Sequence, residues 1–161
     1  MQQRTLGQTR TPISAIGYGA MSFSDFYGPT DDEHSFAILD RCMDLGITHL
    51  DTSNVYGLGL SEQRIGAYLE QRGQQARNFF TIATKAGIAS KPDGSRYYNN
   101  SPEHLRKELD GSLQRLGIEQ VELLYVHRRD ASVPIEEVAQ SLAELVKSGK
   151  TRQIGFSEIA P

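Results

Sequence analysis

Apolar residues recur at helical spacing in four stretches of the chain, and a glycine follows each stretch. The stretches cover residues 31–45, 61–72, 102–116 and 134–148, and the glycines are Gly46, Gly73, Gly117 and Gly149. Glycine adopts the left-handed conformation that ends many helices without steric strain. Residues 30–33 match a threonine-to-glutamate capping box, and Ser101 precedes a proline at a first helical position. This pattern predicts four helices with these bounds.

Short apolar runs alternate with the predicted helices. They cover residues 16–20, 47–50, 79–84, 121–126 and 152–156. Runs that are apolar at successive positions indicate strands buried on both faces, as in a parallel sheet that helices cover. Strands and helices in strict alternation therefore predict an α/β fold with a parallel sheet and right-handed crossovers. Ahead of the first run, residues 5–9 and 11–14 predict a small β-hairpin that can plug one end of a barrel.

One long loop is expected at residues 86–100, and a loop of this length is usually functional or mobile. Two of its tyrosines and three earlier aromatic residues are candidates for a substrate pocket, although packing on the surface explains them equally well. These five residues are Phe23, Phe26, Tyr27, Tyr97 and Tyr98.

Three apolar runs end on a polar, ionisable residue. Asp51, Lys85 and His127 occupy these ends, and Tyr56 follows Asp51 after a short loop. The carboxyl ends of parallel strands open onto one rim, so residues far apart in sequence meet there. Because side chains alternate across a strand, all three strand-end residues can point to the same interior. We therefore expect a site at this rim.

The four side chains suit proton transfer to a carbonyl group. A phenol, with an ordinary pKa of about 10, is a reluctant acid at neutral pH, and a neighbouring ammonium makes proton release easier by stabilising the phenolate. Lys85 can supply the ammonium to Tyr56, and Asp51 can keep it charged and oriented, because an unpaired buried ammonium is unfavourable. His127 can position the carbonyl oxygen by a hydrogen bond.

Reduction of a carbonyl also needs a hydride, which no side chain supplies, so a nicotinamide must bind. The sequence has no dinucleotide-binding fingerprint. Gly17-Tyr18-Gly19 lacks the third glycine and a helix directly after it, and Gly57-Leu58-Gly59 follows no strand directly. Both segments are interpreted as turns.

A series of short motifs runs through the whole chain in a specific order. They are Gly17-Tyr18-Gly19-Ala20-Met21, Asp51-Thr52-Ser53-Asn54-Val55-Tyr56-Gly57, Ser61-Glu62, Lys85, His127-Arg128-Arg129-Asp130 and Ile154-Gly155-Phe156-Ser157-Glu158. Together they resemble the N-terminal part of an aldo-keto reductase. The resemblance implies a (β/α)8 barrel that reduces aldehydes or ketones with NADPH, bound without a Rossmann domain. It also implies that Asp51, Tyr56, Lys85 and His127 form the catalytic tetrad, with Tyr56 as general acid.

The same resemblance suggests the cofactor contacts. Gly19, Ala20 and Met21 match a loop beside the nicotinamide, Asp51 lies at the same rim, and Ser157 matches a residue that holds the carboxamide. Glu158 stands where many members have asparagine. A glutamate still accepts a hydrogen bond from the amide nitrogen, but it cannot donate one.

Each candidate also has a structural interpretation. Asp51 can cap a turn, Lys85 can extend from a strand end, Tyr56 can pack in a loop, and His127 can be a hydrogen-bonded core histidine. The combination favours a tetrad over four separate structural roles. No pair of histidines has ligand spacing backed by a cysteine or carboxylate cluster, so we expect no metal site. The single Cys42 lies among apolar residues at helical spacing and is expected to be a core thiol.

Composition narrows the class of partner. The formal net charge of -3 and a pI near 5.8 argue against a nucleic-acid partner, which requires a clustered positive surface. No apolar run approaches the ~18 residues of a membrane span, and residues 1–5 are not followed by an apolar segment typical of a secretory signal. We therefore expect a cytoplasmic protein without a membrane or nucleic-acid partner, acting on a small carbonyl substrate.

Length sets the last expectation. A complete barrel of this type needs about 250 residues, whereas the chain has 161. Residues 1–161 are thus expected to form the N-terminal portion of a single barrel domain, covering its first five strands and four helices, with no second domain. Two hypotheses follow: a segment of an NADPH-dependent carbonyl reductase that continues beyond Pro161, or a truncated, inactive half-barrel that acts in assembly or interaction.

Overall fold

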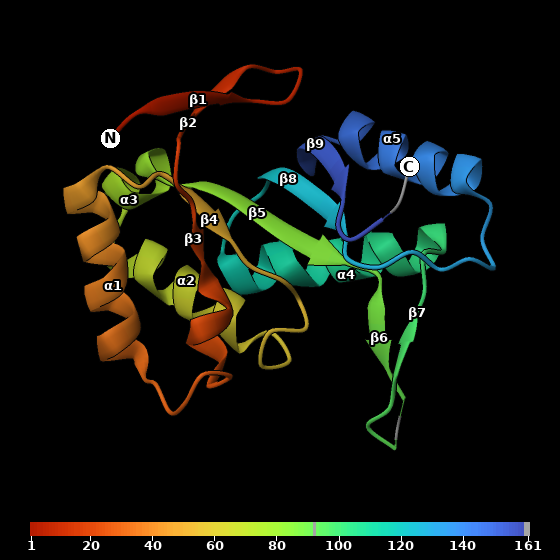
Figure 1. Ribbon diagram of the computed structural model, residues 1–161, viewed down its shortest axis with the longest axis horizontal. Helices are drawn as coiled ribbons and strands as arrows, with labels where there is room; N and C mark the ends of the chain where they lie inside the picture. Colours follow the sequence, from red (N-terminus) through yellow and green to blue (C-terminus); the bar gives the residue numbers. More distant parts are fainter. Residues whose placement is uncertain (92, 160–161) are drawn as a thin grey trace.

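The computed structural model describes residues 1–91 and 93–159. Its centre is a parallel sheet of five strands, and each crossover between neighbouring strands brings the chain back through helical structure (Figure 1). This architecture confirms the α/β prediction. In spatial order the strands are β3 (Tyr18–Gly19), β4 (His49–Asp51), β5 (Thr81–Ala86), β8 (Val121–Val126) and β9 (Thr151–Phe156).

Helices pack against one another in chain order: α1 on α2, α2 on α4, and α4 on α5. The four helices predicted from the sequence are present with ends within one residue of the predicted bounds. These helices are α1 (Asp32–Leu45), α2 (Leu60–Arg72), α4 (Pro102–Leu116) and α5 (Ile135–Lys147). Two helical segments lie outside the prediction: the 3-10 helix η1 (Ala20–Ser24) and the short helix α3 (Gln74–Phe79).

Two caps show how local sequence sets the helix starts. Ser101 Oγ accepts a hydrogen bond from the backbone N–H of His104, as the sequence predicted for α4. The capping box proposed for residues 30–33 is wrong. Asp31, and not the threonine before it, caps α1 by accepting from the N–H of His34 at 2.8 Å.

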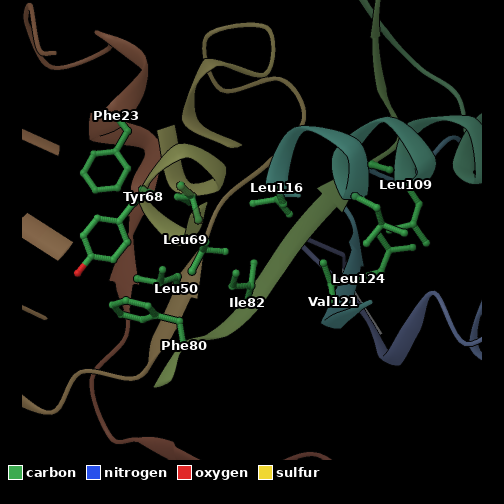
Figure 2. Close-up of a cluster of buried hydrophobic side chains, with 14 of the residues drawn as sticks. Phe23, Leu50, Tyr68, Leu69, Phe80, Ile82, Leu109, Leu116, Val121 and Leu124 are labelled. Carbon is green, nitrogen blue, oxygen red and sulfur yellow. The ribbon is translucent and has the colours of Figure 1, made fainter. Parts of the chain in front are cut away.

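The main core lies between the sheet and the helices. Leu50, Ile82 and Leu124 project from three neighbouring strands towards α2 and α4, where Tyr68, Leu69, Leu109 and Leu116 meet them (Figure 2). Complete burial of such a side chain stabilises a fold by about 1.5–3 kcal/mol. Cys42 is buried here too, as predicted, and burial raises the pKa of its thiol.

The N-terminal hairpin, β1 (Gln3–Leu6) with β2 (Thr11–Ser14), lies at the amino ends of the strands. Thr11 Oγ1 donates to Glu122 Oε1 at 2.5 Å, and the Ser14 and Thr48 side chains each accept from the other's backbone N–H at 2.9 Å. The opposite end of the sheet therefore stays open for a site.

The predicted loop 86–100 contains a second hairpin, β6 (Ile88–Ser90) with β7 (Arg96–Tyr98). Figure 1 shows it leaving the carboxyl end of β5 and extending away from the sheet. The short strands carry no clear alternation of apolar and polar residues, which is why the sequence did not reveal them. In the part of the chain that the structure describes, no helix has both the length and the apolarity that crossing a membrane requires.

Candidate active site

Two neighbouring strands bring Asp51 and Lys85 to the same face of the sheet. Asp51 pairs with Ala83, two residues before Lys85, so the two side chains point the same way. The Lys85 ammonium is buried; it donates to Asp51 Oδ1 and to the backbone oxygen of Thr52, the latter at 2.8 Å. The carboxylate and the carbonyl replace the water that the buried ammonium has lost.

Tyr56 reaches the same ammonium from the loop after β4. Its hydroxyl lies 3.3 Å from Lys85 Nζ, which also lies 4.9 Å from the centroid of the Tyr56 ring. The loop is held in place because the backbone N–H groups of Thr52 and Asn54 continue the pairing with β5. Gly57 then turns the chain with a φ of 60°, and a Cβ there would lie only 2.9 Å from the Cβ of Ser24.

His127 follows β8 directly, and its ring forms a T-shaped pair with the Tyr56 ring, with ring centroids 5.9 Å apart. Ser53 Oγ lies 3.1 Å from His127 Nδ1. The backbone N–H of His127 donates to the carbonyl oxygen of Ala86 at 2.8 Å. Burial, with smaller contributions from the charges of Lys85, Arg128 and Arg96, lowers the pKa of His127 to about 4. At neutral pH the imidazole is therefore uncharged, and it can hydrogen-bond a substrate but cannot serve as a strong acid.

Three of these four residues line one cavity of about 540 Å³, a volume typical of small-molecule sites. Asp51 stands behind them as the partner of Lys85. The other walls come from the loops after four strands and from the β6–β7 hairpin. The lining residues are Met21, Ser24, Phe26, Val55, Tyr56, Gly57, Leu58, Lys85, Ile88, Arg96, His127, Arg128, Ser157 and Glu158.

The candidate cofactor residues other than Asp51, whose carboxylate pairs with Lys85, divide into three groups. Met21, Ser157 and Glu158 line the cavity, and the carboxylate of Glu158 pairs with Arg128 at 2.8 Å. Gly19 pairs with Asp51 at the end of β3, and a Cβ built on it would meet no atom within 4 Å. Ala20 is buried in the core and its carbonyl accepts from Ser61, so its side chain does not face the cavity.

These positions fit a flat, uncharged ring that carries an amide. The space over Gly19 lies beside Asp51 and Lys85, and the Ser157 hydroxyl can bond an amide. Among the aromatic candidates, Phe26 lines the cavity, whereas Phe23 is fully buried in the core. Neither interpretation given for Phe23, the substrate pocket or packing on the surface, is therefore right.

Two residues near these four side chains were not recognised from the sequence. Ser53 bonds His127, and Arg96 lines the cavity from the hairpin. The signal for Ser53 was present, since a small polar residue followed a strand end within the same motif as Asp51. No signal marked Arg96, because its approach depends on a hairpin that the sequence pattern does not show.

Comparison with known proteins shows to which family the chain belongs. Residues 15–161 match the model of the aldo/keto reductase family. The chain is 41% identical to aldo-keto reductase yakc of Schizosaccharomyces pombe, whose name specifies NADP(+), and 37% identical to L-glyceraldehyde 3-phosphate reductase of Escherichia coli. These matches cover 96% and 100% of this chain, but only 45% and 46% of the relatives.

Solved structures share the fold. The holo form of an aldo-keto reductase from Bacillus halodurans matches with a TM-score of 0.86 at 31% identity, covering 100% of this chain and 51% of that one. A glycerol dehydrogenase from Gluconobacter oxydans matches with a TM-score of 0.87 at 28% identity, covering 99% and 49%. The chain thus spans about half the length of the relatives it matches. On these grounds, the chain belongs to the aldo/keto reductase family.

Proposed function

We propose that the protein reduces an aldehyde or ketone to an alcohol with NADPH, and that Tyr56 is its general acid. One observation carries this proposal: the Tyr56 hydroxyl lies 3.3 Å from the Lys85 ammonium at the wall of a cavity. The family gives further support, since one relative is named for NADP(+) and another for reduction of an aldehyde.

NADPH, when bound, supplies the hydride that the carbonyl carbon accepts. The Tyr56 O–H bond breaks as its proton passes to the carbonyl oxygen, so that an alcohol forms and a phenolate remains. The Lys85 ammonium stabilises this phenolate across 3.3 Å, and a proton from solvent restores the phenol. Asp51 keeps the ammonium oriented throughout by its ion pair with Lys85.

His127 acts in this proposal as a neutral hydrogen-bond donor. The Ser53 hydroxyl has one hydrogen and two acceptors within reach, His127 Nδ1 at 3.1 Å and Asn54 Oδ1 at 3.2 Å. The proposal requires that it donates to Nδ1, which selects the tautomer with hydrogen on Nε2 and lets this N–H meet the carbonyl oxygen. The low pKa of His127, about 4, leaves Tyr56 as the proton source at neutral pH. Ser157 and Glu158 are the side chains we assign to the nicotinamide amide, with Met21 against the ring.

The direct test is an assay of the purified protein, expressed from its own gene, with NADPH and benzaldehyde. We expect loss of NADPH absorbance with an equal amount of benzyl alcohol formed, and a slower reaction with NADH. A folded protein that binds NADPH but forms no alcohol from a panel of aldehydes and ketones would contradict the proposal.

Assembly is a second candidate function. Within the described residues, β3 and β9 are the free edges of the parallel sheet, and Ile16 and Ile154 are exposed near them. We propose that residues 1–161 belong to one barrel domain whose sheet continues across these edges.

Light scattering tests whether the protein associates through these edges. A 17.9 kDa species that stays monomeric and reduces aldehydes excludes an assembly role.

A further inference from the structure

The cavity is positively charged although the chain as a whole is acidic. Three cationic side chains and one anionic side chain line it, while the formal net charge of the chain is -3. Two of the cations are neutralised locally: Lys85 pairs with Asp51, and Arg128 pairs with Glu158. Arg96 makes neither an ion pair nor a side-chain hydrogen bond within residues 1–91 and 93–159, so its charge is available to a ligand.

Arg96 reaches the cavity from the β6–β7 hairpin, and buried contacts fix the base of that hairpin. The backbone N–H of Asn99 donates to Gly87 at 2.9 Å and closes the hairpin. The fully buried Asn100 donates to the carbonyl of Arg128 at 3.0 Å and accepts from the N–H of Asp130 at 2.7 Å. The segments that carry the two arginines are thus tied together beside His127.

The position of Arg96 relative to the tetrad limits what it can bind. Tyr56, Lys85 and His127 occupy the part of the cavity where a carbonyl oxygen would lie, and Arg96 lines the same cavity from a separate element. The field of Arg96 reaches the tetrad, because it contributes to the lowered pKa of His127. A guanidinium presents a planar set of N–H donors that matches carboxylate and phosphate oxygens.

We propose that Arg96 selects carbonyl substrates that carry an anionic group, a carboxylate or a phosphate, at the end away from the carbonyl. This inference rests on the proposed reductase function and adds the class of substrate to it. Arg96 is a specificity residue here and takes no part in the proton transfer. Apolar side chains, among them Val55 and Ile88, line the cavity as well and suit the intervening carbon atoms.

Matched pairs of substrates test the proposal in the protein expressed from its own gene. One pair is para-carboxybenzaldehyde with its neutral isostere para-formylbenzamide, and the other is glycolaldehyde phosphate with glycolaldehyde. Arg96→Gln should lower kcat/KM for the anionic members roughly tenfold, as loss of a charge-assisted hydrogen bond does, and change it for the neutral members less than twofold. Arg96→Lys should keep most of the preference.

The control is Lys91→Gln, which removes a charge from the same hairpin at a residue that does not line the cavity. In neither substrate pair should this variant alter the ratio of kcat/KM for the anionic member to kcat/KM for the neutral member. Dependence on Arg96 in only one pair would support the proposal and identify the anion. An equal fall for charged and neutral substrates, or no change for either, would overturn it. If the wild type reduces neither member of any pair, the reductase function itself has failed.

Discussion

Strand β5 contacts one ion pair on each of its two faces, and the two pairs differ in what surrounds them. Lys85 points to the cavity and bonds Asp51, whereas Thr84, one residue earlier, points to the helices and bonds the buried Glu62 at 2.5 Å. Glu62 also accepts from Arg115 Nε at 2.7 Å. On the face of the sheet that the helices cover, protein groups therefore surround the Glu62 carboxylate completely.

The pair of Lys85 with Asp51 differs because it has a phenol and an open space beside it. Tyr56 adjoins the ammonium, and the cavity of about 540 Å³ gives a substrate access to both. A fully buried carboxylate such as that of Glu62 stabilises or specifies a fold, but it meets no ligand. The comparison teaches that chemistry on β5 depends on the neighbours of the charge and not on burial of the charge alone.

The largest expected effect comes from removing the charge of Lys85 at the cavity. Lys85→Met should lower kcat for an aldehyde about a thousandfold, because the Tyr56 phenolate loses the charge that stabilises it. Steady-state NADPH consumption measures this effect. Lys150→Met, which breaks an exposed pair with Asp110 at 2.6 Å, is the control and should leave kcat unchanged.

The pair behind the sheet should show the opposite result. Glu62→Gln leaves Arg115 without its carboxylate and should lower the free energy of unfolding by about 3 kcal/mol, with kcat per folded molecule retained. Urea denaturation measures the stability. The double variant Glu62→Met/Arg115→Met should recover most of the loss; a fall in kcat without any loss of stability would instead place Glu62 in the chemistry.

His127 makes the stability of the protein depend on pH. Its pKa in the folded protein is about 4, below the ordinary 6.5, so the unfolded chain binds the proton more readily between these values. Stability should therefore fall as the pH drops through this window, by roughly 2 kcal/mol between pH 7 and pH 5. In His127→Gln this part of the fall should be absent when both proteins are denatured with urea at the two pH values. An equal fall in unfolding free energy in the two proteins would contradict the attribution of this pH dependence to His127.

Ser53 should have the smallest effect of the set. Ser53→Ala removes the partner of His127 Nδ1 and should lower kcat about tenfold, the size of one hydrogen bond, with little change in NADPH affinity. Ser53→Thr keeps the hydroxyl and should restore most of kcat. A loss of NADPH binding in Ser53→Ala, with kcat unchanged, would show that the serine does not act through His127.

The sequence pattern predicted the elements that have a regular apolar face. Helix α4 and strand β8 are present with the predicted bounds, because buried residues such as Leu105 and Leu109 recur at helical spacing. Helix α3 was missed since Ala76 is its one buried residue, so it has no apolar stripe to detect. The β6–β7 hairpin was missed for a related reason: each strand has three residues and β7 is exposed.

The site was predictable only in part. Strand ends and side-chain alternation placed Asp51 and Lys85 on one face, and the register of β4 with β5 has this arrangement. The contact between Ser53 and His127 depends on a loop conformation that links residues 74 positions apart, and no periodic pattern encodes it. The approach of Arg96 depends in the same way on the hairpin and on Asn100.

The most direct test of the central claim is the rate of a single turnover in Tyr56→Phe. This substitution removes one oxygen and leaves the ion pair of Lys85 with Asp51 in place. With the protein saturated by NADPH and mixed with an aldehyde, we expect the hydride-transfer rate to fall about a thousandfold, while Kd for NADPH stays within about twofold. A wild-type rate in Tyr56→Phe would contradict the assignment of this phenol as the proton donor.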